Sequence, residues 1–231
     1  NSSCELRFSE NLPVVALASP PGAGNTWVRH LLQQATGIYT GSVFHDGQLF
    51  NKGFRGERDN PTSGRTVVVK IHEGSNQVNT TFNAAILLMR NVLDCCISEI
   101  NSRKSRSHTG VAHARSVKSR DIARQISRLH NVVTFWLTRY NGSLLIVHYE
   151  DVMKDTIGEV TRMLDFLNIS EKERRMHCVK KDMEGQFHRQ AKNNITMNGL
   201  DNKTIEILKI ESSYISELIS KQKQRYDSFT T

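Results

Sequence analysis

Residues 13–32, PVVALASPPGAGNTWVRHLL, decide the fold of this chain. The segment begins with an apolar run, passes through two glycines, and continues with apolar residues at helical spacing. A near-continuous apolar run is typical of a strand covered on both faces, as in parallel sheets. A strand, a glycine-bearing turn and a helix in this order direct several backbone N–H groups toward one point. The segment therefore predicts an anion-binding turn.

The same alternation of strand and helix continues along the chain. The apolar runs predict buried strands, and the helical patterns lie between and after them: strands at 13–18, 66–71, 84–89 and 143–147, and helices at 25–36, 91–102, 120–140, 153–167 and 202–223. This order predicts an α/β fold with a central, mainly parallel sheet flanked by helices and a P-loop-like phosphate-binding turn. Asp201 is the expected N-cap of the last helix. Residues 37–65 are expected to form an irregular excursion over the ligand edge.

Composition bounds the class of protein. Of 231 residues, 38% are hydrophobic and 23% charged, which is ordinary globular usage, and no stretch is long and apolar enough for a membrane span. No linker divides the chain, so we expect one domain over 1–231, with a core at 13–190 and a C-terminal helical segment at 200–224. The net charge of +8 suits an anionic ligand without identifying it.

Glycosylation sequons indicate the compartment. Asn-x-Ser/Thr occurs six times, at Asn1, Asn79, Asn141, Asn168, Asn194 and Asn202. This favours the lumen of the secretory pathway, where a disulfide between Cys4 and Cys178, or one of the central pair Cys95 and Cys96, is permitted but not required. The chain has neither a C-x-x-C nor an H-E-x-x-H motif, so we expect no metal site.

Residues 19–27, here called the phosphate loop, follow the first strand. Gly22 and Gly24 allow positive φ and close approach of an oxyanion, and the Thr26 hydroxyl can donate one more hydrogen bond. The Walker pattern G-x-x-x-x-G-K-[ST] is absent. A plain tight turn between strand and helix is the alternative.

Two further clusters lie at predicted strand ends. Lys70 and His72 are two residues apart, so they project from one face at the carboxyl edge of the sheet, where an ammonium can stabilise an oxyanion and an imidazole can accept a proton. Arg90 ends the next strand, and Ser98 lies about two turns into the following helix, which suits a second phosphate. The alternative for the first cluster is a solvated Lys70 with a hydrogen-bonded His72. For the second cluster, the alternatives are an ion pair from Arg90 to Asp94 or Glu99 and a polar Ser98 on the helix surface.

Taken in order, these motifs resemble the sulfotransferases that use 3′-phosphoadenosine 5′-phosphosulfate (PAPS). The phosphate loop resembles P-K-S-G-T-T-W, Lys70–His72 resembles K-T-H, Arg90 and Ser98 have the separation of the 3′-phosphate motif, and residues 149–151 resemble Y-E-D. The resemblance implies PAPS as donor and adenosine 3′,5′-bisphosphate (PAP) as product. It implies His72 as general base, Lys70 as charge stabiliser, and donor contacts from Gly22, Ala23, Gly24, Asn25, Thr26, Trp27, Arg90, Ser98 and Tyr149.

A narrower resemblance is to the sulfotransferase domain of WSC-domain-containing proteins, carried by residues 21–31, 35–42 and 51–58. It implies a Golgi-lumenal, type II membrane protein whose anchor lies outside this sequence, and an anionic glycan acceptor such as sialic acid, with no nucleic acid partner. Two positions depart from the wider family. Its loop lysine is Gly22 here, and Lys70, Arg29, Arg55 and Arg58 are the candidates to supply that charge instead. Its late R-K-G element has only a weak echo in residues 187–189, which makes Arg189 a candidate donor contact.

A basic stretch supports an anionic acceptor. Between 102 and 128 it holds His108, His113 and eight Lys/Arg residues, opposed only by Asp121: Arg103, Lys104, Arg106, Arg115, Lys118, Arg120, Arg124 and Arg128. A solvated basic loop is the alternative. Three other functions stay open at this point: a nucleotide kinase-like phosphotransferase, which the missing Walker lysine disfavours; a non-catalytic glycan-binding domain; and a sulfotransferase for protein tyrosine or a small hydroxylated molecule.

Overall fold

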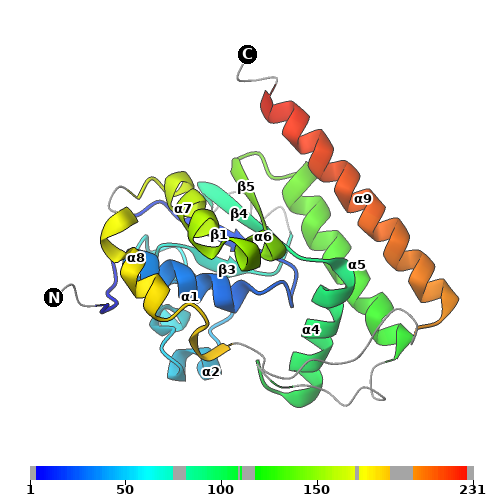
Figure 1. Ribbon diagram of the computed structural model, residues 1–231, viewed down its shortest axis with the longest axis horizontal. Coiled ribbons are helices and arrows are strands. Elements are labelled where there is room, and N and C mark those ends of the chain that lie inside the picture. The colour runs from blue at the N-terminus through cyan, green and yellow to red at the C-terminus, as the bar shows by residue number, and fades with distance from the viewer. Residues whose placement is uncertain are drawn as a thin grey trace.

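The computed structural model describes residues 4–74, 82–108, 110, 118–169, 172–187 and 200–227. Its centre is a five-stranded sheet in the order β2-β3-β1-β4-β5, and every pair of neighbouring strands is parallel (Figure 1). The strands are β1 (Val15–Ala18), β2 (Gly41–Ser42), β3 (Val69–Ile71), β4 (Ala84–Met89) and β5 (Ser143–His148). The predicted α/β fold with a parallel sheet is confirmed.

The order of the strands positions the site. The central strand β1 pairs with β3 on one side and with β4 on the other, so the chain reverses its direction of winding at β1. In open parallel sheets, ligands bind beside the carboxyl ends of the strands at such a switch point. The phosphate loop and Arg90 follow β1 and β4, and Lys70–His72 form the end of β3 and the residue after it, so all three meet at this edge.

Helices cover the sheet in two groups (Figure 1). α1 (Asn25–Thr36) packs against α7 (Thr156–Phe166) and α8 (Lys172–Lys181). α4 (Val92–Ser105), α5 (Ser119–Thr138) and α9 (Asn202–Asp227) pack together on the other side, and α9 runs along α5. Short elements are α2 (Gly47–Asn51), α6 (Tyr149–Lys154) and the 3-10 turns η1 (Arg55–Arg58) and η3 (Gly185–Phe187).

Most element boundaries agree with the sequence, but two predictions need correction and one helix was missed. The helix predicted at 153–167 is two helices, because the chain breaks at Asp155, whose carboxylate accepts from the Gly158 amide and begins α7. α8 was not predicted. The excursion at 37–65 is not wholly irregular, since it contains β2, α2 and η1. Asp201 begins α9 as expected, accepting from the Thr204 amide at 2.8 Å.

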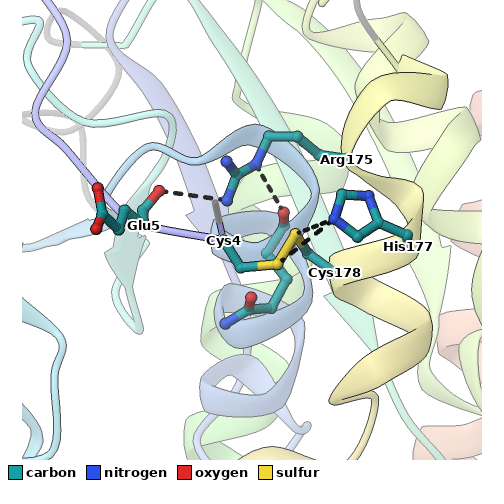
Figure 2. Close-up of a disulfide and its surroundings, with 6 residues drawn as sticks. Cys4, Glu5, Arg175, His177 and Cys178 are labelled. Carbon is teal, nitrogen blue, oxygen red and sulfur yellow. Dashed lines mark hydrogen bonds between the residues drawn. A yellow bond between two sulfur atoms is a disulfide. The ribbon is translucent and has the colours of Figure 1, made fainter. Parts of the chain in front are cut away.

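A disulfide joins the N-terminal segment to α8. Cys4 is bonded to Cys178 (Figure 2). The Arg175 guanidinium strengthens the same contact by donating to the carbonyl oxygens of Glu5 and Gln34 (Figure 2). Cys95 and Cys96 are buried free thiols. Among the described residues, no helix is both long and apolar enough to cross a bilayer.

Candidate active site

The phosphate loop has the backbone of an anion site. Gly22 and Gly24 have φ of 91° and 95°, in the left-handed region that favours glycine. A Cβ at Gly22 would lie 2.2 Å from the Cys95 carbonyl oxygen on α4, and one at Gly24 would lie 2.5 Å from the Tyr149 ring. No side chain caps the N-terminus of α1, and the Thr26 hydroxyl bonds to none of the described residues. The loop therefore has donors available for an anion.

Lys70 presents a positive charge at the carboxyl end of β3. Its side chain is buried, and no carboxylate or carbonyl in the described part of the chain bonds to it. Its Nζ lies 5.4 Å from the centre of the Phe44 ring. Burial, followed by repulsion from Arg29, lowers the pKa of Lys70 to about 8. A buried ammonium without a bonded counter-ion among the described residues is suited to an anionic ligand.

His72 is held in the tautomer that a general base needs. Its Nδ1 donates to the carbonyl oxygen of Ser19 at 2.9 Å, and because a carbonyl can only accept, the proton of the neutral ring is on Nδ1. Nε2 therefore carries the lone pair. The Phe44 ring stacks on the imidazole at 5.3 Å. Burial, with the charge of Lys70 next, lowers the pKa of His72 to about 3, so the ring is neutral at physiological pH.

Arg90 links β4 to the phosphate loop. Its Nη1 donates to the Gly22 carbonyl oxygen at 3.2 Å, and its guanidinium lies 4.3 Å over the Tyr149 ring. Its Nε is buried and has no partner within the described structure. The alternative, an ion pair from Arg90 to Asp94 or Glu99, does not form among the described residues: Arg90 donates to Gly22, and Glu99 pairs with Arg103 and Arg128. An unpaired donor beside the phosphate loop fits a second anionic group.

Aromatic side chains lie beside the phosphate loop and Arg90. Trp27 packs edge-on against Tyr149 at 5.5 Å, and its Nε1 donates to the Met183 carbonyl oxygen at 2.7 Å. This bond places the segment after α8 against the phosphate loop. Ser98 is half-buried on α4. Arg189 lies outside the described residues, so its predicted contact stays a prediction.

Three of the four residues that could replace the family's loop lysine have other contacts. Arg29 is fully buried, ion-paired with Glu57 and bonded to Thr40, so it belongs to the core. Arg55 and Arg58 both lie over the Phe50 ring. Lys70 alone of the four candidates is a buried cation at the sheet edge without a bonded partner in the described structure. The clash at Gly22 explains why no side chain occupies the family's lysine position.

An open groove lies between α2 and the end of α4. Its volume is about 560 Å³, and it is lined by Asp46, Gly47, Gln48, Asn51, Ser102, Arg106, Ser107 and His108. His108 Nε2 and an Asp46 carboxylate oxygen are 2.9 Å apart. Asp46 is two residues from Phe44, which contacts both Lys70 and His72, so the groove lies near the Lys70–His72 pair. Polar side chains and one cation suit a hydroxylated ligand.

The basic stretch is less positive than its sequence suggests. Arg103 and Arg128 pair with Glu99, and Lys104 pairs with Asp121. Glu99 precedes the stretch in sequence, so counting charges within 102–128 missed it. Arg106 is exposed and lines the groove. Arg115 and His113 lie outside the described residues.

Sequence reasoning missed several residues of this site. Phe44 is in the excursion, where nothing in the pattern marks it as the partner of His72. Ser19 directly follows β1, and its contact with His72 depends on the pairing of β1 with β3, which a single sequence does not specify. Met183 is separated from Trp27 by 156 residues. The strand-end rule was the one signal that brought Lys70, His72 and Arg90 together.

The comparisons with known proteins agree with this geometry. The sulfotransferase domain family matches residues 12–216, and the chain belongs to this family. It is 36% identical over 191 residues to WSCD family member CG9164 of Drosophila melanogaster, a match covering 79% of this chain and 59% of that protein. WSCD family member AAEL009094 of Aedes aegypti is 33% identical over 193 residues, covering 80% and 60%. The chain thus spans about 60% of the length of the curated relatives it matches.

A solved structure shares the fold. The crystal structure of the mouse sulfotransferase SULT7A1 matches with a TM-score of 0.51 at 16% identity, over 96% of this chain and 87% of that one. At this identity the likeness concerns the fold.

Proposed function

We propose that this chain transfers a sulfuryl group from PAPS to a hydroxyl group of a glycan. One observation carries the proposal: the anion-binding loop, an unpaired ammonium and a histidine with a free Nε2 lie at the carboxyl ends of adjacent strands. PAPS as donor is supported by family membership and by the mouse SULT7A1 structure, which is a complex with PAP.

The donor would lie along the phosphate loop. The backbone amides of residues 22–26 and the Thr26 hydroxyl hold the 5′-phosphosulfate. Arg90, through its unpaired Nε, and Ser98 hold the 3′-phosphate, and Tyr149 with Trp27 packs near the adenine. Charge-assisted hydrogen bonds of this kind fix a planar guanidinium on a phosphate.

Catalysis rests on position and charge. Sulfuryl transfer resembles phosphoryl transfer in having a loose transition state, so alignment of the reacting atoms and stabilisation of oxyanions dominate. His72 Nε2 accepts the proton of the acceptor hydroxyl as its oxygen attacks sulfur, and the 5′-phosphate of PAP leaves. Lys70 stabilises the negative charge that collects on the sulfuryl group and the leaving phosphate.

The acceptor is proposed to be an anionic glycan, with sialic acid as the first candidate. The net charge of +8 and Arg106 in the polar groove support this class. We also propose that the protein acts in the Golgi lumen, anchored by a segment outside this sequence. The sequons, the Cys4–Cys178 disulfide and the similarity to WSCD family members support this location.

Transfer of labelled sulfate tests the proposal. The wild-type chain is incubated with PAPS carrying radioactive sulfur and with sialylated glycans, their desialylated forms, glycosaminoglycans, tyrosine peptides and small phenols. Label in the sialylated glycans is the expected result. Label in peptides or phenols alone would replace the acceptor class, and binding of glycans without transfer would indicate a non-catalytic module.

A variant of His72 tests the mechanism. A positioned base contributes about 10²–10⁴-fold, so His72→Ala should lower kcat by that order. PAP affinity, measured by calorimetry, should stay close to wild type because the base contacts the acceptor and not the phosphates. Wild-type turnover in His72→Ala would exclude His72 as the base and turn attention to Glu73 or a carboxylate of the 37–65 segment.

A further inference from the structure

We infer that Ser19 and Asn25 are positioning residues that keep the proton of His72 on Nδ1 and leave Nε2 free to accept the substrate proton. The inference rests on the proposed function, because it gives His72 the role of base. It goes beyond that role by assigning the reactive tautomer to the backbone carbonyl of Ser19, supported by the Asn25 amide, which engages the competing Ser19 hydroxyl.

Three side chains form a continuous chain of hydrogen bonds. His72 Nδ1 lies 2.9 Å from the Ser19 carbonyl oxygen and 3.2 Å from the Ser19 hydroxyl oxygen. The Asn25 side-chain nitrogen donates to that hydroxyl oxygen at 3.1 Å and to the Leu17 carbonyl oxygen at 3.0 Å. Ser19 is 0% exposed and Asn25 is 4% exposed, so water does not compete for these bonds.

The Ser19 hydroxyl is the group that could oppose the tautomer set by the Ser19 carbonyl. If the hydroxyl donated to Nδ1, the neutral ring would carry its proton on Nε2 and could not accept one there. Asn25 donates to one lone pair of the hydroxyl oxygen, and Nδ1–H faces the other. The hydroxyl is thus used as an acceptor, and its own proton points away from the ring.

The amide of Asn25 is held through its nitrogen. Its Oδ1 is buried without a partner in the described structure, while both hydrogens of Nδ2 are used. An amide kept for packing alone would not leave a buried oxygen unpaired, since that costs free energy. The donor nitrogen is therefore the functional part of this side chain. Threonine, the residue of the family motif at this position, retains one donor.

Nitrogen NMR of the histidine side chains tests the tautomer directly. In the wild-type chain labelled with ¹⁵N-histidine, the His72 signals are assigned by their absence in His72→Ala. The expected pattern is a protonated Nδ1 and an unprotonated Nε2 at pH 7. A protonated Nε2 in the wild type would overturn the inference, whatever the activity of the protein.

Variants then connect the tautomer to turnover. Asn25→Ala frees the Ser19 hydroxyl, so we expect signal from the Nε2–H tautomer and a fall in kcat of about tenfold or more; a wrong histidine tautomer costs a serine protease up to about 10⁴-fold. Asn25→Thr should restore most of the Nδ1–H tautomer and most of kcat. Ser19→Ala removes the competing hydroxyl but keeps the carbonyl, and should retain the Nδ1–H tautomer.

PAP affinity separates positioning from loop damage. Asn25 belongs to the phosphate loop through its backbone, so calorimetry with PAP is the control, and we expect its Kd to change less than twofold in these variants. Asn25→Ala with a weakened PAP Kd and an unchanged tautomer would overturn the inference. An active wild type with the Nε2–H tautomer refutes the inference alone, whereas a wild type with Nδ1–H but no transfer to any acceptor refutes the proposed function alone.

Discussion

Replacing Gly22 with alanine tests whether the shape of the phosphate loop is fixed by its contact with α4. The residue has φ of 91°, and an added Cβ would lie 2.2 Å from the Cys95 carbonyl oxygen and 2.9 Å from the Glu99 amide nitrogen. All of these neighbours are backbone, so no side chain can rotate aside. The loop or α4 must move.

The cost has two parts. A left-handed conformation costs a residue with a Cβ about 1–2 kcal/mol, and forcing an extra carbon into a packed site costs typically about 1–3 kcal/mol. Together they give about 2–5 kcal/mol. If the loop shifts to relieve the clash, the cost falls on donor binding, and a loss of 2 kcal/mol corresponds to about 30-fold in Kd.

Two measurements capture both possibilities. Urea unfolding gives the loss of stability, and calorimetry gives the affinity for PAP; we expect their combined loss to be about 2–5 kcal/mol. Gly47→Ala is the matched control, because nothing lies within 4 Å of its added Cβ, and it should be neutral or stabilise α2 by about 0.4–1 kcal/mol. Wild-type unfolding together with wild-type PAP affinity in Gly22→Ala would refute the reasoning.

Three other perturbations follow from the site. Arg90→Ala should weaken PAP binding by about 1.5–3 kcal/mol, while Arg103→Ala, an equal change of charge in an exposed ion pair, leaves the affinity unchanged by calorimetry. The pH profile of kcat/KM should show no acid limb from His72 between about pH 5 and 7, because the pKa of His72 is lowered to about 3. The same profile should fall above about pH 8 as Lys70 loses its proton. An acid limb at about pH 6–7 that disappears in His72→Ala would contradict the first expectation. Cys4→Ser opens a disulfide of sequence separation 174 and should cost about 2–4 kcal/mol of unfolding free energy, and an unchanged urea midpoint would contradict it.

The fold could be predicted because its signals are local. Strand β4 and helix α1 have the predicted bounds of 84–89 and 25–36, since apolar runs and helical periodicity are both read within a short window. The break at Asp155 was missed because the apolar pattern continues across it. α8 was missed because its sequence, KERRMHCVKK, is mostly charged, and it is held by the disulfide and by contacts to α1.

The site could be predicted only as far as the strand-end rule extends. That rule placed Lys70, His72 and Arg90 at one edge without any knowledge of the strand order. It could not supply Phe44 or Ser19, because their contacts with His72 depend on how β3 pairs with its neighbours. A histidine in a model peptide has a pKa of about 6.5. The structure moves it much lower, because burial, which no residue pattern shows, is the largest cause.

The same burial explains how this chain can function without the family's loop lysine. A lysine at position 22 is excluded by the backbone of α4, so the positive charge must come from a different strand. Lys70 is suited to this, since it has no counter-ion among the described residues and its pKa, lowered to about 8, leaves it charged at neutral pH. That charge also helps to hold the pKa of His72 low, after burial as the larger cause, because a second positive charge beside an ammonium is disfavoured. Lys70→Met should lower turnover through the loss of the oxyanion contact. His72 should stay neutral and able to accept a proton in this variant, because burial, the largest cause of its low pKa, is unchanged.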